Sequence, residues 1–126
     1  MEQTQSVAPQ ALIESYLDAV REKDISRCLD FYHDDARLHF MMGVFKGKKA
    51  IADWHKERFD AEMEIVRVGK ITTKGDTVSV DASVTSKKIR AFKIARLAGK
   101  ASFRLDDGKI KEVKLSPRIY NPFEGW

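Results

Sequence analysis

The sequence has a single cysteine, Cys28, and no run of the about 18–20 apolar residues that cross a membrane. Because a lone cysteine cannot form an internal disulfide, nothing in the composition requires an oxidising compartment. Residues 1–10 lack the basic and apolar segments of a secretory signal. We therefore expect a cytoplasmic protein that does not bind membranes, in which Cys28 is a buried structural thiol rather than a nucleophile.

The excess of positive charge is also small. The chain has 23 Lys and Arg against 19 Asp and Glu, a net charge of +4, and its lysines are scattered. This distribution does not indicate a nucleic-acid partner. The sequence also lacks a phosphate-binding glycine loop, a nucleophile elbow and a Cys-x-x-Cys pair. We expect no nucleic acid, no cofactor and no metal.

The first half of the 126 residues has the apolar spacing of helices, and its length suits one domain. Pro9 suits a first helical turn, and Asp24 suits the N-cap of a second, short helix. Three helices are expected, over about residues 9–22, from Asp24 onward, and over about residues 48–60. Between the second and third helices, residues 33–35 are interpreted as a turn and residues 37–40 as a short strand.

The second half has the period of two that is typical of strands. The clearest example is the alternation of valine and alanine with polar residues from Val78 to Val84. Expected strands cover about residues 63–73, 78–84, 89–105 and 109–116. The third of these is expected to be kinked near Gly99, and the order of Ile110 and Val113 predicts a bulge in the last.

This order of elements predicts an α+β fold in which a highly curved antiparallel sheet wraps around three N-terminal helices. Such a sheet leaves a concave interior, the usual place for a small-molecule site. The predicted domain covers residues 9–117, after a disordered segment at 1–8. The aromatic tail 118–126 is expected to pack on the sheet, on the pocket mouth or on a second subunit.

Several segments of the first half resemble the nuclear-transport-factor-2-like superfamily. They are Ile13–Leu17, Lys23–Ile25, Phe31–Ala36 and Gly47–Ile51, followed by Trp54. Within that superfamily the chain is most similar to the SnoaL-like polyketide cyclases and the ketosteroid isomerases. The resemblance covers about residues 10–117 and implies a cone-shaped, cystatin-like fold with one pocket, and a homodimer formed through the convex sheet. It does not fix a function, because the superfamily includes several chemistries and proteins with none.

The resemblance to ketosteroid isomerases also allows us to ask whether this sequence has the residues that their chemistry needs. Tyr16 and Tyr32 match two pocket tyrosines of that family. The position of the carboxylate base falls on Phe40, and that of the protonated aspartic acid falls near Ala98. Since each such group contributes roughly 10²–10⁴-fold in rate, we reject steroid isomerisation with the usual Asp base.

The same resemblance implies the site. Tyr16, Tyr32 and His55 are the catalytic candidates, because a tyrosine and a histidine near neutrality can act as an acid–base pair. The residues expected to line a hydrophobic pocket are Val20, Leu38, Phe40, Trp54, Phe92, Ile94, Phe103 and Val113. Two plainer interpretations stay open: the aromatic residues are ordinary core, and His55 is a solvated or core-edge histidine.

Three functions follow from these observations. The first is a cofactor-independent cyclase, isomerase or dehydratase of SnoaL-like type that acts on a small hydrophobic carbonyl compound. The second is a non-catalytic protein that binds a small hydrophobic ligand in the same pocket. The third is a protein-interaction or dimerisation module that uses the convex sheet.

Overall fold

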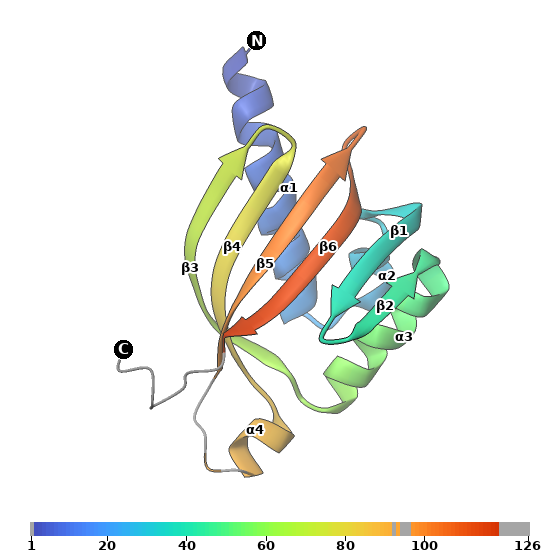
Figure 1. Ribbon diagram of the computed structural model, residues 1–126, viewed down its shortest axis with the longest axis vertical. Coiled ribbons are helices and arrows are strands. Elements are labelled where there is room, and N and C mark those ends of the chain that lie inside the picture. Colours follow the sequence, from blue (N-terminus) through green and yellow to red (C-terminus); the bar gives the residue numbers. More distant parts are fainter. Residues whose placement is uncertain (1, 92, 94–96, 119–126) are drawn as a thin grey trace.

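The computed structural model describes residues 2–91, 93 and 97–118 (Figure 1). The helices are α1 (Glu2–Arg21), α2 (Ile25–Leu29), α3 (Gly47–Asp60) and α4 (Lys87–Ala91). The strands are β1 (Tyr32–Phe40), β2 (Gly43–Lys46), β3 (Glu64–Lys74), β4 (Thr77–Thr85), β5 (Leu97–Asp106) and β6 (Lys109–Arg118). Phe92, Ile94 and the tail 119–126 lie outside the described residues.

The six strands form one sheet in the order β2-β1-β6-β5-β4-β3. Neighbouring strands are antiparallel except β1 and β6, which run parallel, with Leu38 opposite Val113 and Phe40 opposite Leu115. The strands are curved, and α1 lies behind the sheet while α3 lies beside β1 and β2 (Figure 1). The expected α+β fold, with three N-terminal helices against a curved sheet, is confirmed.

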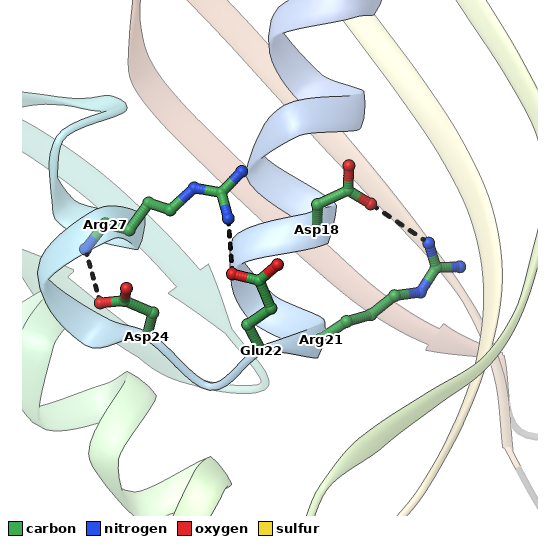
Figure 2. Close-up of polar contacts among 5 residues, drawn as sticks. All are labelled: Asp18, Arg21, Glu22, Asp24 and Arg27. Carbon is green, nitrogen blue, oxygen red and sulfur yellow. Dashed lines mark hydrogen bonds and ion pairs between the residues drawn. The ribbon is translucent and has the colours of Figure 1, made fainter.

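The junction of α1 and α2 is fixed by local polar contacts (Figure 2). The Asp24 carboxylate accepts from the backbone N–H of Arg27 at 3.1 Å and caps α2, as the sequence predicts. Arg27 also pairs with Glu22 at 2.6 Å, and Arg21 lies 3.6 Å from Asp18. The cap holds the one-turn helix in place, and β1 begins three residues after that helix ends.

A bulge between the last two strands is also confirmed. Leu105 lies opposite Ile110, but Arg104 lies opposite Glu112, so Lys111 is the extra residue of β6. As a result Ile110 and Val113 both turn inward, with 0% and 1% of their surface exposed.

The predicted strand over residues 89–105 is wrong at its beginning. Residues 87–91 form α4, and the hydroxyl of Ser86 accepts from the backbone N–H of Ile89 at 3.3 Å, as an N-cap does. Strand β5 begins only at Leu97. Alternating apolar residues indicated a strand here, although the Ser86 hydroxyl caps the first turn of a helix.

Two further boundaries differ from the predictions. Residues 33–35, expected as a turn, are part of β1, whose register with β6 shifts between Tyr32 and Arg37. Helix α1 begins at Glu2, so Pro9 lies inside it rather than in its first turn. No helix among the described residues has the length and apolar character needed to cross a membrane.

The core lies between the sheet and the helices. Its members come from α1, α2, α3 and every strand except β2 and β3. Burying a large apolar side chain stabilises the fold by roughly 1.5–3 kcal/mol. Among the described residues, His55 and Thr85 are the polar side chains that share this interior, and His55 is 0% exposed.

Candidate functional site

A continuous chain of hydrogen bonds joins the three catalytic candidates. The Tyr32 hydroxyl donates to the Tyr16 oxygen at 2.7 Å, and Tyr16 lies 2.7 Å from Nε2 of His55. The other ring nitrogen of His55, Nδ1, lies 2.7 Å from the carbonyl oxygen of Ile51. The exposed fractions of Tyr16, Tyr32 and His55 are 5%, 0% and 0%. The structure therefore brings together side chains that are 16 and 39 residues apart in the sequence.

Three different elements position these side chains. Tyr16 belongs to the inward stripe of α1, together with Ile13 and Val20. Tyr32 is the first residue of β1, directly after the α2 turn. His55 lies on α3 one turn after Ile51, so its ring reaches back to the carbonyl of that turn.

The direction of the chain follows from one contact. A carbonyl oxygen only accepts, so Nδ1 of His55 carries the hydrogen that bonds Ile51. In the neutral ring Nε2 is then a bare acceptor, and the Tyr16 hydroxyl donates to it. Tyr32 in turn donates to Tyr16. The hydrogens of the chain are thus all donated in one direction, from Tyr32 on β1 to Tyr16 on α1 and from Tyr16 to His55 on α3.

Burial keeps the three groups neutral. It raises the pKa of the Tyr16 hydroxyl well above its ordinary value of 10.0, and the neighbouring Tyr32 adds to this. Burial also raises the pKa of Tyr32, although its hydrogen bond with Tyr16 opposes the change. The pKa of His55 is lowered from 6.5 by burial, against the opposing effect of the Ile51 carbonyl. At neutral pH the ring of His55 is therefore an uncharged base.

Aromatic rings surround the chain. Phe31 and Phe103 pack edge-on against Tyr16, with ring centroids 5.9 and 5.7 Å away. The Trp54 ring lies 5.0 Å from that of His55, and its Nε1–H has no hydrogen-bond partner within the described part of the chain. A buried donor without a partner has lost its hydrogen bonds to water, so the burial of the Trp54 N–H costs free energy.

The family follows from the sequence comparison. The model of the SnoaL-like domain matches residues 13–113, a span that contains all three candidates. The chain belongs to the SnoaL-like domain family. None of the curated proteins matches it.

Solved structures show the same fold. A candidate polyketide cyclase from Xanthomonas campestris pv. campestris has a TM-score of 0.76 at 21% identity, over 95% of each chain. The epoxide hydrolase/cyclase-like enzyme SalBIII, with a role in pyran ring formation in the polyether salinomycin, has a TM-score of 0.77 at 20% identity, covering 94% of this chain and 95% of its own. A candidate ketosteroid isomerase from Kribbella flavida has a TM-score of 0.78 at 18% identity, covering 93% and 83%. At these identities the likeness concerns the fold.

Most residues predicted to line a pocket lie in the core of this SnoaL-like domain. The buried ones are Val20, Leu38, Trp54, Phe103 and Val113. Phe40 is partly buried and packs against Trp54, with ring centroids 5.6 Å apart. Phe92 and Ile94 fall outside the described residues. The interpretation of His55 as a solvated or core-edge residue is wrong, because its side chain is fully buried.

Two hollows on the SnoaL-like domain lie away from the hydrogen-bonded chain. One, of about 470 Å³, lies where α1 ends and β3 begins, and is lined by Val20, Arg21, Lys23, Met63, Glu64 and Ile65. The other, of about 220 Å³, is lined by residues of β3, β4 and β5, including Asp81 and Arg67. Neither is lined by Tyr16, Tyr32 or His55, so packed side chains enclose these three groups.

Sequence reasoning missed three contributors to this interior. Phe31 and Phe59 contact the rings of Tyr16 and His55, and the carbonyl of Ile51 fixes the hydrogens of His55. The spacing of Ile51 and His55, one helical turn, occurs at every position of a helix and so gave no signal for the last contact. Cys28 is fully buried beside the chain, and burial raises the pKa of its thiol to about 12, which agrees with its interpretation as a structural thiol.

Proposed function

We propose that this SnoaL-like domain is a cofactor-independent enzyme, a cyclase, isomerase or dehydratase, that acts on a small hydrophobic carbonyl compound. Tyr16, Tyr32 and His55 form its acid–base group. The observation that carries the proposal is the hydrogen-bonded chain of these three side chains inside an apolar, aromatic interior. Burying three polar side chains costs free energy that an apolar core would avoid, which favours a use for them.

The chemistry assigned to the group is general base catalysis by His55 through the tyrosines. Its lowered pKa leaves the ring uncharged at neutral pH, ready to take up a proton. The two tyrosines, with raised pKa values, keep their hydrogens until a proton is passed along the chain. Phe40 packs on Trp54 at the position where a steroid isomerase would hold its base, which supports a base of another kind.

The neighbours in the fold support this reaction class. The candidate polyketide cyclase and the cyclase-like enzyme with a role in pyran ring formation are both named for ring-closing chemistry. A cyclase, an isomerase and a dehydratase of this type share one elementary step, the movement of a proton on a carbon next to a carbonyl group. The proposal can therefore be tested before the natural substrate is known.

The test measures deuterium uptake from D₂O next to the carbonyl group in a panel of hydrophobic ketones and hydroxyketones. We expect the wild-type protein to accelerate uptake, and His55→Gln and Tyr16→Phe to lose roughly 10²–10⁴-fold of that rate. His39→Gln, on the opposite face of β1, is the matched control and should keep the full rate. Equal rates for the His55 and His39 variants, with both folded by circular dichroism, would refute the proposal.

A second candidate is a non-catalytic binder of a small hydrophobic ligand. It is favoured by the hollow of about 470 Å³, which Val20, Met63 and Ile65 help to line and which lies apart from the polar chain. Mass spectrometry of compounds retained by the protein from a lysate separates the two. An unaltered compound that the wild-type protein and His55→Gln retain equally supports the binder.

The oligomeric state is a separate proposal. We propose a homodimer formed through the convex face of the sheet, from which His39 and Glu112 point outward. Light scattering should give the mass of a dimer for the wild type. It should give the mass of a monomer for His39→Glu, because this substitution places a second carboxylate beside Glu112. A monomeric wild type contradicts it.

A further inference from the structure

The outward face of the sheet gathers cations that are scattered in the sequence. Residues directly opposite each other on neighbouring strands share a face, and Leu38 and Val113 face the core, so the residues that alternate with them point outward. The strand registers define four outward rows across the middle of the sheet. The cations of these rows, which we call the cationic face, are Arg37, Lys46, Arg67, Lys74, Lys100, Arg104 and Lys114, and the acids are Asp81 and Glu112.

The charge of this face is large for the protein. Seven Lys and Arg against two acids give these rows a net charge of +5, whereas the whole chain has +4. Beyond the rows, Lys109 lies opposite Asp106, and Lys111 likewise pairs with Asp35, so these pairs add nothing. Among the ion pairs of the described residues, Arg104 is the one member of the cationic face that takes part. The middle of the sheet therefore presents an uncompensated positive field to water.

The remaining outward side chains of the four rows are mostly hydroxyls. They are Thr72, Thr77, Ser79, Ser83, Ser102 and Ser116, with His39, Ala98 and, on the edge strand β2, Val44. None of these residues is aromatic, although aromatic side chains anchor tight protein interfaces and stack on the bases of single-stranded nucleic acids. Hydroxyls and cations are instead the usual partners of phosphate oxygens. The chemistry of the face therefore suits a phosphate polyanion whose bases stay paired.

The hollow of about 220 Å³ opens on the same face. Arg67 and Ser83 of the outward rows line it, together with Lys70 and Asp81. A phosphate group in this hollow would meet two cations and a hydroxyl donor against one carboxylate. The hollow therefore offers one defined contact point within the broad positive field.

We infer that the cationic face binds double-stranded nucleic acid through its phosphates, without reading the base sequence. One row runs from Lys46 to Lys74, across all six strands, and at about 4.8 Å per strand it spans about 24 Å. A duplex carries one negative charge per about 1.7 Å of its axis, so its charge extends over the same length. Sequence spacing alone gave no sign of this partner, because the registers of five strand pairs bring the cations together.

A bilayer carries similar anionic groups but suits the face less well. Stable attachment to a membrane needs an apolar anchor besides cations, and the large apolar side chain of the four rows is Val44, at the edge of the sheet. The exposed Met41 and Met42 lie beyond that edge, at the tip of the β1–β2 hairpin.

The homodimer proposed above would use the same face. A second copy would bring like charges together, a cost that a polyanion does not incur. The two occupants therefore exclude each other, and nucleic acid should compete with the second copy. The inference does not rest on the proposed acid–base group, which lies in the core on the other side of the sheet.

The first experiment measures the affinity for a labelled DNA duplex of about 20 base pairs, by fluorescence anisotropy at pH 7.5. If five to seven cations meet phosphates, log affinity against log salt concentration should have a slope of roughly −4 to −6. A second duplex of unrelated sequence should bind equally. The absence of binding in 50 mM NaCl, or a slope near zero, would overturn the inference and leave the proposed function untouched.

The second experiment removes the same charge from two places. Lys100→Gln with Lys114→Gln takes two cations from the face, whereas Lys56→Gln with Lys88→Gln takes two exposed lysines from α3 and α4. Because both double variants have the same net charge, long-range attraction is matched between them. We expect the first to lose about tenfold or more in affinity and to have a slope shallower by about 2, and the second to stay within about twofold of the wild type. Equal losses in two variants that circular dichroism shows to be folded would overturn the inference, since net charge alone would then explain binding.

A third experiment separates the other occupants of the face. Sedimentation with phosphatidylcholine vesicles that contain about 30% phosphatidylserine tests a membrane, and binding to vesicles but not to the duplex would overturn the inference. Light scattering during addition of the duplex tests the second copy. A protein dimer that dissociates as the duplex binds supports competition for one face, and a dimer that persists on the duplex overturns it.

Discussion

Two histidines on opposite sides of the sheet lie in different environments. On its outer face, His39 donates from Nε2 to the Glu112 carboxylate at 2.7 Å, and 32% of its side chain is exposed. Across the sheet, fully buried His55 of α3 bonds a tyrosine and a carbonyl and meets no charged partner among the described residues. The outer histidine belongs to a charged network that water screens, and the inner one to a neutral chain with fixed hydrogens.

The difference in burial determines how much each contact contributes to the stability of the fold. The outer contact combines modest attraction with screening by water and salt, so its contribution to stability is about 0–1 kcal/mol. The inner contacts are shielded from water, and removal of one partner leaves the other buried and unpaired at a cost of roughly 1–3 kcal/mol. Stability should therefore depend strongly on His55 and weakly on His39.

The largest expected effect is on the free energy of unfolding. His55→Ala removes the acceptor of Tyr16 and leaves a cavity beside Trp54, so we expect a loss of roughly 2–4 kcal/mol. His39→Ala should cost less than about 1 kcal/mol, since its site is open to water. Urea denaturation of both variants measures the difference. Similar losses for the two would break the contrast between the faces.

A smaller effect is expected in the pH dependence of stability. The pKa of His55 is lowered by folding from 6.5, so below that pH the unfolded chain holds more protons at this residue than the folded one. The stabilisation is complete above pH 6.5 and is lost as pH falls toward the folded pKa, by at most about 1.4 kcal/mol per pH unit. Denaturation of the wild type and of His55→Gln between pH 7.5 and 5.5 isolates this contribution as a difference.

The two curves should converge as the pH falls, because the variant has no group to titrate at residue 55. Parallel curves for the wild type and His55→Gln would mean that His55 keeps its ordinary pKa in the folded protein.

Sequence patterns predicted the parts of the fold that local physics decides. The period of β4, the cap at Asp24 and the bulge near Ile110 each depend on neighbouring residues, and each was found. The start of β5 was missed because apolar and polar residues alternate on both sides of the Ser86 cap. That pattern suits a strand as well as it suits a short helix.

The candidate site was only partly predictable. The resemblance to a family indicated Tyr16, Tyr32 and His55, but their contact depends on three elements that meet only after folding. The full burial of His55 comes from the aromatic rings packed around it, and the direction of its hydrogens depends on one backbone carbonyl, that of Ile51. No residue pattern encodes which of two ring nitrogens bears a hydrogen.

The smallest expected effect concerns the outer pair. The hydrogen bond from His39 lowers the pKa of Glu112, so this carboxylate stabilises the fold above its unfolded pKa of 4.5, and the contribution is lost as pH falls through the folded value. We expect Glu112→Gln to cost less than about 1 kcal/mol at pH 7. Because exposed charges are screened, the cost should shrink in 1 M salt, whereas that of His55→Ala should not. Thermal melting of both variants at low and high salt checks this, and a salt-independent cost at Glu112 would show that the outer contact is shielded like the inner one.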